Sequence, residues 1–130
     1  LNFTVDELHN DIGVNASARA VMECLYPDEV KTVPDIARSK GVSRQHIQVI
    51  MNNLTENGLV SGRDNPKDKR TFLMSLTKSG KRKFEIIMRR ETDFIQNISE
   101  KFTNREVATA SSVLNKLSSL IEGYENENSN

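Results

Sequence analysis

The chain has 130 residues, enough for one domain with a modest core, and its 36% hydrophobic and 28% charged content is typical of a soluble globular protein. No apolar run approaches the roughly 20 residues that a membrane helix needs, which excludes a membrane protein. The formal net charge is zero. The charge is unevenly distributed, however, because residues 37–90 carry thirteen Lys and Arg against four Asp and Glu, and both flanking stretches are acidic.

The single cysteine, Cys24, has no partner for an intrachain disulfide, and no signal-peptide pattern opens the chain. We therefore expect a protein of the reducing cytoplasm. The chain begins at Leu1 rather than Met, so we expect that further residues precede it. The basic middle of the chain indicates a polyanionic partner, since a surface of this sign attracts nucleic-acid phosphates.

The first part of the chain predicts two helices. Residues 3–10 have mixed polarity and are interpreted as the end of a helix that breaks at Asp11-Ile12-Gly13. Asn15 then precedes an apolar pattern of helical period that reaches Tyr26. Pro27 ends this second helix.

A helix-turn-helix is predicted next. Thr32 and Pro34 have the character of the cap and first turn of a short helix to about Ser39, and Gly41 supplies the sharp turn that follows. Ser43 then caps a second helix. Its apolar residues follow the spacing i, i+3, i+4 and i+7 and are Ile47, Ile50, Met51 and Leu54.

The residues after Asn57-Gly58 predict a β-hairpin. Leu59-Val60 and residues 71–76 have strand character, and we expect residues 61–70, rich in turn-forming and charged side chains, to be its protruding loop. This order predicts a mainly α fold with a small β-hairpin wing (α+β), a winged helix-turn-helix.

Two further helices are predicted after Thr77. The first is long, and the second opens at Thr103 with a capping-box pattern that places Glu106 three residues later. Both have more apolar surface than the small winged helix can cover, which favours a homodimer over a self-contained helical hairpin. We expect one domain over residues 1–130, with a core at 15–77, dimerisation helices at 1–14 and 78–123, and a flexible tail at 124–130.

Two clusters of polar side chains are candidates for contact with double-stranded DNA. In a helix-turn-helix, the second helix presents its outward face to base edges in the major groove, where Arg suits guanine and Gln suits adenine. The outward residues of this helix are Ser43, Arg44, Gln45, His46 and Gln48. The basic residues of the hairpin are Arg63, Lys67, Lys69 and Arg70. Asp68, two residues before Arg70, is placed to orient its guanidinium.

These segments resemble the MarR/SlyA family of winged-helix transcriptional regulators over about residues 15–122. The resemblance rests on five stretches of the sequence, of which the Asp-x-Arg wing and the Leu-Thr-x-x-Gly that follows it are the most specific. They are Val33-Pro34-Asp35-Ile36-Ala37, Gly41-Val42-Ser43-Arg44, Leu54 to Val60, Asp64 through Asp68-Lys69-Arg70, and Ser75-Leu76-Thr77-Lys78-Ser79-Gly80.

The resemblance implies a homodimer with interlocking first and last helices, which binds a pseudo-palindromic operator as a repressor. It implies that Arg70 enters the minor groove and that Asp68 orients it. It also implies that a small aromatic or anionic effector modulates DNA affinity from a pocket beside the dimerisation helices. Candidate lining residues for such a pocket are His9, Met22, Tyr26 and Arg82.

Other functional classes find less support in the sequence. There is no phosphate-binding glycine loop, nucleophile elbow or paired carboxylate motif, so we expect no enzyme. His9 and His46 lack a cluster of ligands at metal-binding spacing, so we expect no metal and no cofactor. A winged helix that binds proteins instead of DNA remains the alternative, and it predicts exposed apolar residues on the second helix of the motif.

Overall fold

The structure, a computed structural model, describes residues 10–128, and the chain divides into two units between Glu91 and Thr92. The first unit holds η1 (Asn10–Ile12), α2 (Ala16–Leu25), α3 (Val33–Lys40), α4 (Arg44–Glu56), β1 (Val60–Asp64), β2 (Phe72–Leu76) and most of α5 (Lys78–Ser99). The second holds the end of α5 and then α6 (Asn104–Asn128). The predicted fold class is confirmed, since the described elements are helices and one antiparallel hairpin.

Three capped helices form the centre of the first unit. The side chains of Asn15, Thr32 and Ser43 each accept a hydrogen bond from the backbone amide three residues later, at 2.8–3.2 Å. Each therefore satisfies one of the amides that a helix leaves unpaired in its first turn. Between α3 and α4, Gly41 has a φ of 65°, which glycine adopts without steric cost. The predicted caps and turn are confirmed.

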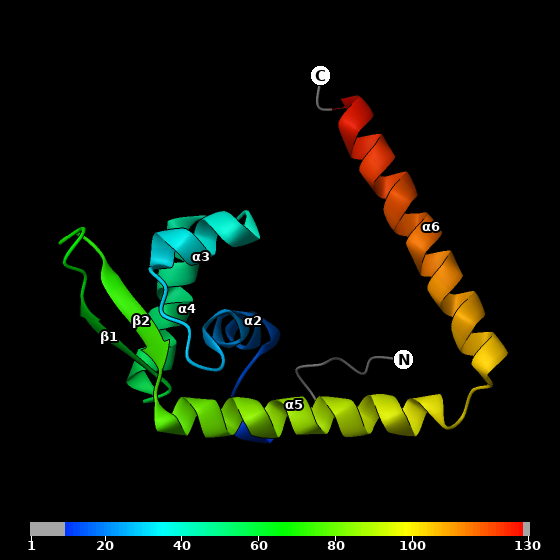
Figure 1. Ribbon diagram of the computed structural model, residues 1–130, viewed down its shortest axis with the longest axis horizontal. Helices are drawn as coiled ribbons and strands as arrows, with labels where there is room; N and C mark the ends of the chain where they lie inside the picture. The colour runs from blue at the N-terminus through cyan, green and yellow to red at the C-terminus, as the bar shows by residue number, and fades with distance from the viewer. Residues whose placement is uncertain (1–9, 129–130) are drawn as a thin grey trace. The chain divides into compact units, whose positions relative to one another are not determined.

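One hydrophobic core joins these helices to the hairpin and to the start of α5. The core includes the apolar faces of α2 and α4, which pack against each other. Helix α4 also contacts α3 and β1 (Figure 1). The principal buried side chains of the core are Val21, Met22, Leu25, Ile36, Ala37, Ile47, Met51, Leu54, Leu59, Val60, Met74, Phe84 and Ile87. Burial of α4 on this side leaves the opposite side of the helix to solvent.

The hairpin is longer than the sequence predicted. Strand β1 continues to Asp64 in register with Phe72, so residues 61–64 are strand and the prediction that they belong to the loop was wrong. Beyond Val60 this strand is solvent-exposed, so it carries none of the apolar alternation that identifies a half-buried strand, and ladder pairing with β2 determines its conformation. The backbones of Lys31 and Met74 exchange hydrogen bonds of 3.0 and 2.8 Å, which fix β2 to the segment before α3.

The end of the hairpin and the start of α5 meet at Thr77. The amide of Thr77 donates to the carbonyl of Leu59 at 3.1 Å, and its hydroxyl donates to the carbonyl of Gly58 at 2.6 Å. The same hydroxyl accepts the amide of Gly80 at 3.0 Å, which caps α5. A Cβ on Gly80 would lie 1.9 Å from the Leu59 carbonyl oxygen, so only glycine fits this position. The Leu-Thr-x-x-Gly motif is thus explained by close backbone packing.

Ion pairs hold α5 against the rest of the first unit. Arg19 on α2 donates to both carboxylate oxygens of Glu91, at 2.6 and 2.8 Å, and also to Glu23. Donation to Glu91 raises the pKa of Arg19 above its ordinary value. A second bidentate pair, at 2.6 and 3.0 Å, joins Arg90 to Asp11. Since both arginines make paired hydrogen bonds, they fix the direction of the helix as well as its position.

The second unit begins with the last residues of α5, which ends at Ser99, before Phe102. The predicted capping box is confirmed, because Thr103 and Glu106 exchange side-chain to backbone hydrogen bonds of 3.1 Å. Helix α6 then continues through Asn128, so residues 124–128, expected to form a flexible tail, belong to this helix in the structure. That stretch contains no proline, and a helix already formed extends readily into polar residues.

Replacement of Gly80 by alanine tests the close packing beneath α5. We expect Gly80→Ala to lower the free energy of unfolding by about 1–3 kcal/mol, because the new methyl group must displace the Leu59 backbone. Gly123→Ala is the matched control, since it lies in α6 with no atom within 4 Å of the added Cβ, and helix propensity alone should make it neutral or slightly stabilising. Urea unfolding of both variants measures the difference; equal effects would contradict this explanation of the motif.

Candidate nucleic-acid interface

The exposed face of α4 carries the first cluster of predicted contact residues. Side chains of Ile47, Met51 and Leu54 anchor the helix in the core, and its other side is open to solvent. All five predicted residues of this cluster are exposed: Ser43, Arg44, Gln45, His46 and Gln48. The hydroxyl of Ser43 is already used, since it accepts the His46 amide as the helix cap. The remaining polar groups can meet a partner.

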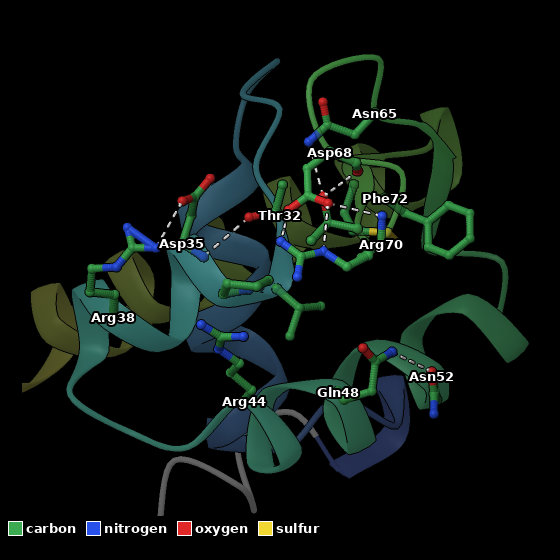
Figure 2. A pocket seen from close by; sticks show the side chains of 14 residues that line it. Thr32, Asp35, Arg38, Arg44, Gln48, Asn52, Asn65, Asp68, Arg70 and Phe72 are labelled. Carbon is green, nitrogen blue, oxygen red and sulfur yellow. Dashed lines mark hydrogen bonds and ion pairs between the residues drawn. The ribbon is translucent and has the colours of Figure 1, made fainter.

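A pair of side-chain amides lies one turn further along α4. Gln48 Nε2 donates to Asn52 Oδ1 at 2.8 Å, as Figure 2 shows. The pair leaves a Gln48 carbonyl oxygen and an Asn52 amide nitrogen available on the exposed side. Asn52 was missed in the sequence analysis, although its spacing of four residues from Gln48 on a helix predicts this contact.

The loop at the tip of the hairpin, residues 65–71, is held by its own side chains. Asn65 Oδ1 accepts the Lys67 amide at 3.1 Å, and Asn65 Nδ2 donates to the Thr71 hydroxyl at 3.0 Å. The Thr71 amide and hydroxyl both donate to the carbonyl of Asp68 at 3.1 Å. Asx turns of this kind fix a short loop without a core. Sequence reasoning identified the charges of this loop but missed Asn65 and Thr71.

Within this loop Asp68 holds the Arg70 guanidinium. Its carboxylate accepts Arg70 Nε at 3.1 Å and Nη2 at 3.4 Å, and it also accepts the Arg70 amide at 3.0 Å. The Arg70 side chain is nevertheless 89% exposed. Hydrogen bonds from Arg70 lower the pKa of Asp68 below its usual value. The structure therefore presents a directed but solvent-accessible arginine.

A groove of about 950 Å³ separates this loop from α3 and α4 (Figure 2). Three arginines from three elements line it: Arg38 of α3, Arg44 of α4 and Arg70 of the hairpin loop. Gln48, Asn52 and Asp68 also face it. The predicted residues that do not line it are Ser43, Gln45, His46, Arg63, Lys67 and Lys69, all of them exposed. The structure thus joins members of the two predicted clusters on one concave surface and adds Arg38, which sequence reasoning missed.

Residues predicted for an effector pocket do not form one described cavity. Met22 is fully buried in the core, Tyr26 makes a tilted ring contact with Phe84 at 4.9 Å between centroids, and Arg82 is exposed on α5. His9 lies outside the described residues. Neither of the two described pockets is lined by any of them, and this assignment stays a prediction.

Across residues 10–128, no group of three His, Cys, Asp or Glu is arranged to hold a metal ion. None of the helices in that range is long and apolar enough to cross a lipid bilayer. Cys24 is a free thiol, half-buried against the core.

Sequence comparisons match part of the chain to known proteins. No family model matches the chain. Curated relatives in Mycobacterium tuberculosis and Mycobacterium bovis are 36% identical over 76 residues, or 58% of this chain and 53% of theirs, and are uncharacterized. The chain thus spans about half the length of the curated relatives it matches.

Solved structures are similar over most of the chain. A MarR family transcription regulator matches with a TM-score of 0.85 and 25% identity, covering 95% of this chain and 82% of that one. A mutant of Escherichia coli MarR complexed with operator DNA gives a TM-score of 0.71 at 24% identity, with 87% and 81% covered. PcaV of Streptomyces coelicolor gives 0.79 at 20% identity, with 92% and 90% covered.

The helix-turn-helix and its hairpin define the chain as a winged helix-turn-helix protein. It has the fold of the MarR family transcription regulators, and the resemblance found in the sequence is confirmed.

The ion pair in the hairpin loop predicts a measurable titration. Because the pKa of Asp68 is lowered in the folded chain, the pair orders the loop above about pH 4 and is lost as the pH falls through the folded value. We expect Arg70→Gln to return the pKa of Asp68 towards 3.8, measured by carboxyl NMR titration. Arg63→Gln, an exposed arginine on β1, is the control and should leave it unchanged. An unaltered Asp68 titration in the Arg70 variant would show that the two side chains do not pair in solution.

Proposed function

We propose that this protein is a transcriptional regulator that binds double-stranded DNA through α4 and the hairpin. The observation that carries the proposal is the groove in which Arg70, directed by Asp68, faces Arg44 and Gln48 across open space. Recognition helices contact base edges with such side chains, and a basic loop can follow the backbone or enter the minor groove beside them. The operator complex of the E. coli neighbour supports the same use of the fold.

Lys and Arg supply the sequence-independent part of binding in this proposal. Arg63, Lys67 and Lys69 are exposed on the hairpin, where they can neutralise phosphates. The acidic flanks of the sequence keep the remainder of the chain from competing for DNA.

The proposed regulator acts as a homodimer. Helix α6 exposes a row of large apolar side chains, and monomeric proteins rarely leave such a row in water. The row consists of Val107, Val113, Leu114, Leu117, Leu120, Ile121 and Tyr124. A second copy of the same helices is the simplest cover, and a two-fold dimer would bind a pseudo-palindromic operator. Repression at such an operator is the outcome that the family resemblance favours.

Effector control belongs to the same proposal. The resemblance to the MarR/SlyA family supports regulation by a small aromatic or anionic ligand that changes the affinity of the protein for DNA. We propose that this regulation takes place in the cytoplasm.

Loss of the directed arginine tests DNA binding. We expect Arg70→Ala to weaken binding by about 1–3 kcal/mol if its guanidinium enters the groove. The duplex is one selected by the protein from random DNA, and the measurement is fluorescence anisotropy across a salt series. Arg105→Ala, an exposed arginine on α6, is the matched control and should behave as the wild type. Equal affinity of the wild type and the Arg70 variant would remove the hairpin from the mechanism.

A charge on the apolar row tests the dimer. We expect Leu117→Glu to produce monomers in sedimentation equilibrium, because two copies would bury like charges against apolar surface. Ser119→Glu places the same charge on the opposite side of α6 and should leave the dimer intact. Since Leu117 is 49% exposed, its replacement should not unfold the winged helix. A dimer that survives Leu117→Glu would show that α6 does not form the interface.

A further inference from the structure

Val49 is an apolar residue in an unexpected place. It lies in the middle of α4, and its side chain is 69% exposed. The apolar residues two positions before and after it, Ile47 and Met51, are buried at 1% exposure. Among the described residues of α4, Val49 is the large hydrophobic side chain left in water, and neither the core nor the sequence analysis gives it a role.

Helix geometry places Val49 at the centre of the exposed face. Each residue of an α-helix turns by about 100°, so residues two positions away point to nearly the opposite side and those four away point almost the same way. Ile47 and Met51 therefore face the core directly behind Val49. Gln45 and Asn53 lie beside it along the outward face, and both are exposed. Val49 therefore lies on the side of α4 opposite the core, with its side chain in solvent.

The surroundings of Val49 are polar. Its outward neighbours Gln45, Gln48 and Asn52 are all side-chain amides. A protein-docking surface requires several apolar residues in one patch, and α4 offers a single one. An isolated apolar group among hydrogen-bonding groups is suited to a partner surface of the same composition. The major groove is such a surface, because thymine carries a 5-methyl group beside its O4 acceptor.

We propose that Val49 contacts the 5-methyl group of a thymine and thereby selects an A·T pair at one position of each half-site. This inference rests on the proposed DNA-binding function and names a determinant of its specificity. The adjacent Gln48 and Asn52 pair adds a matching pattern, since its free carbonyl oxygen and free amide nitrogen suit the N6 donor and N7 acceptor of adenine.

Removal of the thymine methyl group tests this contact directly. The probe is a duplex selected by the wild-type protein from random DNA, in which thymines are replaced one at a time by deoxyuridine. Deoxyuridine pairs with adenine as thymine does but lacks the methyl group. We expect the wild type to bind about fourfold more weakly when one particular thymine is replaced, as for the loss of one buried methyl-sized group. Val49→Ala should bind the parent duplex more weakly and lose its sensitivity at that position.

Val30→Ala is the matched control, because Val30 is another exposed valine, outside α4. It should keep the affinity of the wild type and its response to deoxyuridine. The Val49 variant should fold normally, since its side chain is exposed and alanine is the better helix former. Circular dichroism and thermal unfolding verify this.

The outcomes separate the two proposals. If Val49→Ala keeps the response of the wild type to deoxyuridine, or if the wild type binds DNA with steep salt dependence yet ignores every methyl removal, the Val49 contact is refuted and DNA binding stands. If the wild type retards no duplex at low salt, the proposed function fails, and the inference about Val49 fails with it.

Discussion

The close approach of Gly80 to the Leu59 carbonyl is the constraint on which the winged helix depends. At this point the chain leaves α4, enters the hairpin, returns from it and begins α5, and all four segments meet within a few hydrogen bonds of Thr77. A side chain on Gly80 would separate them. Because both ends of the hairpin are tied here, the direction of the hairpin relative to α4 follows from backbone packing rather than from the charged loop itself.

A second attachment completes this arrangement at the other end of β2. The bridge between Lys31 and Met74 joins the hairpin to the segment that leads into α3, while Met74 itself fills the core beneath the strand. The groove between hairpin and helices thus has walls fixed at both sides. Its shape is determined by apolar packing and backbone hydrogen bonds, and its chemistry by the polar side chains that the core leaves outside.

Sequence patterns predicted most of this fold because the relevant signals are local. Caps at Asn15, Thr32 and Ser43 depend on contacts three residues away, and such contacts can be inferred from neighbours in the chain. The end of β1 could not be inferred, since Arg63 and Asp64 are in a strand only because residues eight or more positions later pair with them. Arg38 and Asn65 were missed at the site for the same reason: their place on the groove depends on tertiary structure. Val49 was overlooked because it lies outside the apolar spacing of α4 and is not one of the polar residues expected to contact DNA.

Because Asp68 pairs with Arg70, the basic residues of the hairpin differ in what they can contribute to binding: long-range attraction or a preorganised contact. A guanidinium paired with a carboxylate projects little net charge into solution, so Arg70 contributes weakly to the long-range attraction that brings a polyanion to the surface. We expect that attraction to come from Lys67 and Lys69, which have flexible stems and form no ion pair within residues 10–128. Arg70 loses its conformational freedom during folding instead of during association, and its remaining donors already have a direction when a partner arrives. A lysine at position 70 would keep the positive charge but lose this preorganisation, because an ammonium group cannot form the paired hydrogen bonds that a planar guanidinium makes with a carboxylate.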